Sequence, residues 1–155
     1  MFAYVYSSPI GDLTIAEKKG FLTAVAFGAA IPAGYSRCDT PLIRQTAGQL
    51  REYFAGCRKQ FDLPLAPEGT AFQQKVWAAL QTIPYGATVS YLDIAVQIGN
   101  ARACRAVGMA NHNNPVSIII PCHRVIGKDG SLVGYGGGLD IKTQLLKLEQ
   151  GDILF

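Results

Sequence analysis

The sequence predicts an α+β fold, in which a small N-terminal lobe of one sheet and one helix precedes a mostly helical C-terminal lobe containing a helix-turn-helix. Strand-like apolar runs lie within residues 2–27, whereas helix start and stop signals dominate the chain after residue 70. Between the two patterns, residues 65–69 carry proline and glycine, which break both periodicities. We therefore expect two domains, at residues 1–65 and 66–155.

Composition and charge limit the class of protein. The 155 residues are 49% hydrophobic, which is ample for a packed core, and no run approaches the ~20 apolar residues of a membrane span. The N-terminal segment lacks the features of a signal peptide, so we expect a cytoplasmic protein without membrane contact. The net charge of +3 suits a polyanionic partner but does not identify one.

The cysteines and histidines give no sign of a metal site. The four cysteines are irregularly spaced, and without a secretory signal we expect them to be free thiols. Only two histidines are present, and no two cysteines have the C-x-x-C spacing of a zinc site. We therefore expect no metal and no cofactor.

Three strands and one helix are expected in the N-terminal lobe. The strands lie at residues 2–6, 13–16 and 21–27, and the turns between them predict an antiparallel meander. Thr40 and Pro41 form a helix start, with an N-cap residue followed by proline at the first helical position, and Gly56 ends the helical spacing. This helix is expected to cover one face of the sheet.

The C-terminal lobe is expected to begin and end with a helix. Thr70 caps the first of these helices, residues 84–86 close it, and Trp77 lies on its apolar stripe as a core anchor. The last helix is expected to place a set of leucines toward the core and Glu149 near its end. These leucines are Leu139, Leu145, Leu146 and Leu148.

Two short helices joined by a glycine-containing turn predict the helix-turn-helix. They are expected at residues 91–98, where Ser90 is the cap, and at residues 101–112. The second helix is rich in alanine and glycine, so its backbone can approach a partner closely, and Arg102 and Arg105 are its only charges. Small residues also allow helices to pack closely on each other, so this outline alone does not decide between DNA binding and packing.

The apolar run at residues 116–120 is interpreted as a buried strand that stops at Pro121. Because proline has no N–H to continue a ladder, Cys122 is expected at the strand end on rigidly held backbone, which suits a reactive group. The alternative is that Cys122 is one more small buried hydrophobe, the commonest fate of a free cysteine.

A reactive Cys122 needs a base, since its ordinary pKa of ~8.5 leaves a thiol mostly protonated near neutral pH. His123 is the neighbouring candidate, although adjacent residues on extended backbone point to opposite sides. A bridging water, or a turn directly after the proline, would bring the two groups together. The histidine would then need a carboxylate to orient it, and Glu149 is the expected acid.

Six short motifs follow one another at consistent spacing in the C-terminal lobe. In chain order they are Tyr85-Gly86, Ser90-Tyr91, Arg105-Ala106-Val107-Gly108, Asn114-Pro115, Pro121-Cys122-His123-Arg124-Val125 and the glycine run from Tyr135 to Leu139. This set resembles the O6-alkylguanine-DNA alkyltransferase family, also called methylated-DNA-protein-cysteine methyltransferases. The N-terminal lobe agrees only in general architecture, which the resemblance implies to be ribonuclease H-like.

The resemblance implies a DNA-repair protein that is consumed by its own reaction. Cys122 would take the alkyl group from the O6 atom of guanine in double-stranded DNA, with O4-alkylthymine as a further candidate substrate. The protein would act as a monomer and take the damaged base out of the duplex through the minor groove. Arg105 would fill the vacated stack, and the remaining DNA contacts would come from Tyr91, Ala103 and Gly108.

The same resemblance implies roles around Cys122. Tyr91 would assist base extrusion and donate a proton toward the leaving guanine, and Asn114 would brace the turn behind the active site. His123 would link Cys122 to Glu149 through a water. The base pocket would be lined by Val125 and by the backbone of Gly136, Gly137 and Gly138.

Two departures from the family pattern and two other functions were considered. Gly136 stands where some members carry serine, and the first lobe lacks the ligands of the structural zinc found in some relatives. A non-enzymatic, alkyltransferase-like lesion-binding protein is the alternative, but such relatives replace the nucleophile, and Cys122 argues against it. A cysteine hydrolase is a third hypothesis, for which the sequence offers no oxyanion arrangement.

Overall fold

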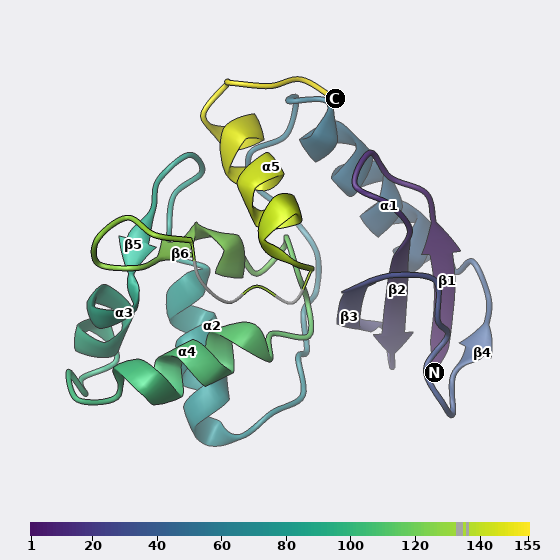
Figure 1. Cartoon of the computed structure of the whole chain (residues 1–155). Helices are drawn as coiled ribbons and strands as arrows, with labels where there is room; N and C mark the ends of the chain where they lie inside the picture. The colour runs from purple at the N-terminus through teal and green to yellow at the C-terminus, as the bar shows by residue number, and fades with distance from the viewer. Residues whose placement is uncertain (133–134, 136) are drawn as a thin grey trace. The chain divides into compact units, whose positions relative to one another are not determined.

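The N-terminal strands form the predicted antiparallel meander (Figure 1). In the computed structural model, which describes residues 1–132, 135 and 137–155, they are β1 (Phe2–Tyr6), β2 (Leu13–Lys18) and β3 (Phe21–Phe27). A short strand β4 (Ser36–Arg37), which the sequence pattern does not indicate, pairs in parallel with β1. The sheet order is β3-β2-β1-β4.

Helix α1 (Pro41–Phe54) covers one face of this sheet, as predicted (Figure 1). Its start is defined by Thr40, whose side-chain oxygen accepts a hydrogen bond of 3.2 Å from the backbone N–H of Ile43. Gly56 adopts a φ of 76° just after the helix, a left-handed conformation that ends helical hydrogen bonding. The buried face of α1, together with strands β1 to β3, makes the apolar core of the first unit.

The chain forms two compact units. The first contains Met1–Glu68, Pro115–Ile119 and Leu154–Phe155, and the second contains Gly69–Asn114 and Ile120–Ile153. Leu65, in the stretch predicted to be a linker, forms a single parallel bridge with Leu22 of β3. Pro115–Ile119, which follows the helix-turn-helix in sequence, also belongs to the first unit.

Helices dominate the second unit. They are α2 (Ala71–Leu80), α3 (Tyr91–Gln97), α4 (Cys104–His112) and α5 (Leu139–Glu149), accompanied by a two-stranded parallel ladder of β5 (Val89–Ser90) and β6 (Val125–Ile126). Thr70 and Ser90 each form a capping box with the third residue of the following helix. None of the helices in the described ranges is long and apolar enough to cross a bilayer.

The helix-turn-helix consists of α3 and α4, which pack on each other and on α2. Helix α4 begins at Cys104 rather than at residue 101, because the N–H of Ala103 bonds to Asn100 O at 3.0 Å and so closes a turn before the helix starts. Trp77 is the predicted core anchor: it is buried, and its indole Nε1–H donates to Ala110 O at 2.8 Å. Helices α2 and α4 are thereby joined by packing and by a hydrogen bond.

Leu139 does not reach the core, contrary to prediction. It is 48% exposed, whereas Leu145, Leu146 and Leu148 are buried as expected. Leu139 occupies the first position of α5, one turn before the buried Lys142, and the core ends at that turn. The leucine spacing identifies the helix face but not where along the helix the burial begins.

The prediction of a strand at residues 116–120 is wrong. Only Val116 pairs, in a single-residue bridge with Val25 of β3, and the chain then turns. Ile118 has a φ of 72°, and the N–H and C=O of the residues on either side of it bond at 2.8 Å, which makes a γ-turn. All residues of the run are buried, so its continuous apolar character reports burial and not extended backbone.

Replacing Trp77 by phenylalanine is expected to lower the free energy of unfolding by about 1 to 3 kcal/mol, because the Ala110 carbonyl near the end of α4 loses its donor. Chemical denaturation followed by circular dichroism measures the change, since Trp77 is the single tryptophan. Phe21→Leu is the control, because Phe21 is 47% exposed and its variant should stay within about 0.5 kcal/mol of wild type. A Trp77→Phe variant as stable as this control would contradict the role of the indole hydrogen bond.

Candidate active site

Two backbone turns deliver Cys122 to its position. Pro121 has φ −82° and ψ 64°, and the N–H of Cys122 donates to Ile120 O at 2.8 Å, which together make an inverse γ-turn. Cys122 then begins the 3₁₀ helix η1 (Cys122–Arg124). The predicted strand end is therefore replaced by a turn directly after the proline, which removes the opposed geometry of neighbouring residues on extended backbone.

The thiol of Cys122 is buried and protonated at rest. Only 3% of the residue is exposed, and burial raises the pKa of the thiol to about 11, against the opposing effects of a hydrogen bond from Asn114 and the charge of Lys142. A thiol with this pKa carries almost no thiolate near neutral pH. It can act as a nucleophile only if a base takes its proton during the reaction.

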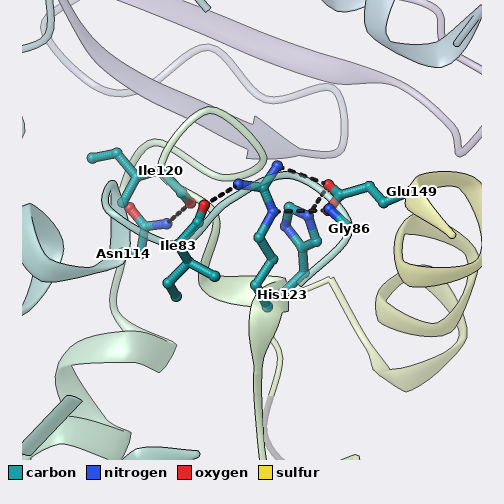
Figure 2. A network of polar contacts seen from close by, with 7 residues as sticks. Ile83, Gly86, Asn114, Ile120, His123 and Glu149 are labelled. Atoms are coloured by element: carbon teal, nitrogen blue, oxygen red, sulfur yellow. Dashed lines mark hydrogen bonds and ion pairs between the residues drawn. The ribbon is translucent and has the colours of Figure 1, made fainter. Parts of the chain in front are cut away.

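His123 of η1 and Glu149 of α5 form a buried pair (Figure 2). The Nε2 of His123 lies 2.6 Å from Oε2 of Glu149, and neither side chain is exposed. Burial lowers the pKa of His123 below its ordinary value, and the hydrogen bond to Glu149 opposes this only in part. The imidazole is therefore neutral near neutral pH, and since a carboxylate only accepts, Nε2 carries its hydrogen.

Arg124 keeps the carboxylate of Glu149 ionised. Its Nε and Nη2 donate to the two oxygens of Glu149 at 2.8 and 3.1 Å, and its Nη1 donates to Ile83 O at 2.7 Å. The N–H of Gly86 adds a fourth hydrogen bond to the carboxylate, at 3.2 Å (Figure 2). Burial opposes ionisation, but the hydrogen bonds from His123 and Arg124 and the charge of Arg124 outweigh it and hold the pKa of Glu149 well below its ordinary value.

The second ring nitrogen of His123 is the chemically available one. With Nε2–H directed at Glu149, Nδ1 is a lone-pair acceptor. It is buried, and no residue in the described part of the chain donates to it. A neutral imidazole held by an ionised carboxylate is the arrangement of a general base, because the carboxylate stabilises the cation that proton uptake creates.

Asn114 and Tyr91 both lie near the thiol, as their predicted roles require. The Nδ2 of Asn114 donates to Ile120 O at 2.8 Å, directly before the proline (Figure 2). Tyr91 is the first residue of α3 and is half-buried, and burial raises its pKa above the ordinary value. Tyr91 therefore keeps its phenolic proton and can donate it.

Of the four predicted DNA-binding residues, Tyr91 begins α3 and the other three lie in or directly before α4. Arg105 is exposed in the first turn of the helix, and Ala103 is its N-cap residue, which contributes no side-chain cap. Gly108 faces Tyr91: a Cβ added there would lie 4.0 Å from the tyrosine ring. Gly108 thus lies beside a predicted active-site residue, and its role in contacting DNA stays a prediction.

Of the predicted base-pocket residues, Val125 is buried and its carbonyl accepts a hydrogen bond of 2.6 Å from Lys142 Nζ. Gly137 is half-buried in a turn before α5, and Gly138 is exposed. Gly136 lies outside the described residues. The pocket that these residues are predicted to line therefore stays a prediction.

Three groups of the site were not predicted from the sequence: Arg124, Lys142 and Gly86. Arg124 was part of a motif without an assigned role, and Gly86 belonged to the closing turn of a helix. Lys142 carries the clearest signal, because it lies at helical spacing from Leu145 and Leu146 within an apolar stripe. A charge in such a stripe indicates a buried group that needs a partner.

Two family models match the chain. The 6-O-methylguanine DNA methyltransferase, ribonuclease-like domain, matches residues 1–67, and the 6-O-methylguanine DNA methyltransferase, DNA binding domain, matches residues 71–151. Between them the two models cover most of the sequence.

Known proteins are similar over nearly the full length. A methylated-DNA-protein-cysteine methyltransferase from Methanosarcina barkeri is 50% identical over 99% of both chains. A constitutive protein of the same name from Bacillus subtilis is 45% identical over 92% of both chains. Among solved structures, Mycobacterium tuberculosis OGT in complex with DNA has a TM-score of 0.92 at 46% identity and covers 99% of this chain and 96% of its own.

Replacing Glu149 by glutamine is expected to lower the free energy of unfolding near neutral pH by about 3 to 5 kcal/mol, because Arg124 would stay buried without its ionic partner. The pH dependence should change as well. The folded-state pKa of Glu149 lies below its ordinary 4.5, so its stabilisation is complete above that pH and is lost as the pH falls below it. Glu149→Gln should lack this loss.

Denaturant titrations from about pH 7 to about pH 3 measure both effects. Asp140→Asn is the matched control, because it removes the same charge from an exposed position of the same helix. The control should keep the wild-type pH dependence. If Glu149→Gln lost as much free energy of unfolding at low pH as the wild type, the assignment of the ion pair would be contradicted.

Proposed function

The chain belongs to the 6-O-methylguanine DNA methyltransferase family, and on that premise we propose that it repairs DNA by moving an alkyl group from O6-alkylguanine in DNA to its own Cys122. The observation that carries this proposal is a buried, protonated thiol beside a neutral histidine held by an ionised carboxylate. The acceptor is the protein itself, so each molecule reacts once. O4-alkylthymine is a further candidate substrate.

The proposed step is a displacement at the alkyl carbon. Cys122 Sγ forms a bond to this carbon while the bond from the carbon to guanine O6 breaks. The thiol proton passes through a water to His123 Nδ1, and Glu149 stabilises the resulting imidazolium. Guanine leaves with a proton supplied toward its ring by Tyr91. His123 then releases the thiol proton to water and Tyr91 takes a proton from water, so the sum of the reaction is a thioether and unmodified guanine. A thioether is not restored by thiol reduction, which makes the transfer irreversible.

We propose double-stranded DNA carrying O6-alkylguanine as the partner of α3 and α4. The small residues of α4 allow a close approach in the minor groove, and the exposed Arg105 is placed to fill the stack after the base has been extruded. Val125, Gly136 and Gly137 would line the base pocket. The protein would act as a monomer, and the division into domains at residues 1–65 and 66–155, like the cytoplasmic location, stays a prediction.

The transfer predicts one methyl group per protein molecule, on Cys122 alone, after incubation with methylated duplex DNA. Intact-mass measurement gives the stoichiometry, and peptide mapping locates the methyl group among the four cysteines. Cys122→Ser should abolish transfer while it folds normally, because a hydroxyl occupies similar space but is a far poorer nucleophile.

Other results would support different functions. Binding to alkylated DNA without any transfer would identify a lesion-binding protein, and an unmodified Cys122 would exclude the transfer. Repeated turnover of an acyl substrate would identify a cysteine hydrolase, which a strictly stoichiometric reaction excludes.

Arg105→Ala is expected to slow repair of duplex DNA by about ten- to 100-fold, because base extrusion costs a few kcal/mol that the arginine helps to offset. Reaction with free O6-benzylguanine should keep its wild-type rate, since a free base needs no extrusion. Single-turnover assays on both substrates measure this. Arg51→Ala, which removes an exposed arginine from α1, is the control. An equal loss on both substrates would make Arg105 a structural residue.

A further inference from the structure

Two buried asparagines, one in the last turn of α4 and one just after the helix, donate hydrogen bonds to the turn that carries the nucleophile. Asn111 lies in α4, and Asn114 lies two residues beyond the end of the helix. The Nδ2 of Asn114 donates to Ile120 O at 2.8 Å, and the Nδ2 of Asn111 donates to Cys122 O at 3.3 Å. The two carbonyls that flank Pro121 therefore each accept a side-chain amide.

This turn needs such support. Pro121 holds ψ at 64°, far from the extended value near 145° that proline favours when it is unconstrained. The Ile120 carbonyl is held twice, by the Cys122 N–H and by Asn114. The Cys122 carbonyl is also held twice, by the Val125 N–H and by Asn111. Asn111 thus supplies one of the two hydrogen bonds that hold the carbonyl of the peptide between Cys122 and His123.

We propose that Asn111 is a positioning residue for alkyl transfer, an inference that rests on the proposed function. By holding the Cys122 carbonyl, its amide sets the orientation of the peptide that joins the nucleophile to its base. This orientation decides whether Sγ and the His123 imidazole lie on the same side of η1. The helix that exposes Arg105 thereby also aligns the thiol.

A purely stabilising role does not explain an amide at this position. Asn111 is 1% exposed, and its Oδ1 is buried with no hydrogen-bond partner among the residues that the structure describes. An unpaired buried oxygen is unfavourable, so leucine, which has nearly the same shape, would serve packing better. What asparagine adds is the donor to Cys122.

Asn111→Leu tests the proposal, with Asn113→Leu as the matched control, because Asn113 lies just beyond the same helix and is exposed. Single-turnover transfer from saturating methylated duplex gives two quantities. The amplitude counts competent molecules, and the rate constant reports alignment. DNA affinity is measured separately on the unmethylated duplex, and the transfer is repeated with free O6-benzylguanine.

We expect Asn111→Leu to keep one methyl per molecule and wild-type DNA affinity, while its rate constant falls about ten- to 100-fold on both substrates. The control should match wild type. A wild-type rate constant in Asn111→Leu, or a loss of amplitude without a loss of rate, would overturn the inference. Asn111→Ala, read in the same way, decides the matter if the leucine variant does not fold. Absence of transfer in the wild-type protein would instead refute the proposed function.

Discussion

The carboxylate of Glu149 is the group on which the site depends. A buried charge is tolerated only when partners satisfy it, and here Arg124 donates through two nitrogens while His123 and Gly86 donate one hydrogen bond each. These contacts connect the last turn of α5 to η1 and to the segment that follows α2. Because the permanent charge of Arg124 keeps the carboxylate ionised, His123 is held in one tautomer with Nδ1 free to accept a proton. One side chain therefore serves both the packing of the second unit and the chemistry proposed for it.

The surroundings of Cys122 combine an inert thiol with constrained backbone. Burial raises the pKa of the thiol to about 11, so that it does not react until a substrate and a base act on it together. The approach to it contains Ile118, a β-branched residue with a φ of 72°, a conformation that costs on the order of 1 to 3 kcal/mol. Such a backbone persists only where neighbouring contacts determine it, and the Val116 bridge and the bonds at Ile120 do so here. An unreactive resting thiol on a fixed backbone suits a nucleophile that is used once.

Helix α4 links recognition to reaction. Its first turn exposes Arg105, whereas Ala110 and Asn111 near its end are buried, and one accepts and the other donates a hydrogen bond. Between these ends, Gly108 lies close to the ring of Tyr91. A helix of this kind can contact DNA with one part and hold the nucleophile with the other, which relates the two predicted functions of the C-terminal lobe to a single element.

Local chemistry determined much of this protein from sequence alone. The meander and the caps at Thr40, Thr70 and Ser90 follow from interactions between residues close in the chain, and the sequence pattern shows such interactions directly. Tertiary structure decided the rest. Burial of the run at residues 116–120 is compatible with a strand or a turn, and only the pairing partners distinguish them. The partners of the buried charges lie far along the chain: 25 residues separate Arg124 from Glu149, 63 separate Gly86 from Glu149, and 17 separate Lys142 from the carbonyl it holds. Periodicity carries no information about which distant groups will satisfy a buried charge, because that is set by how the helices pack.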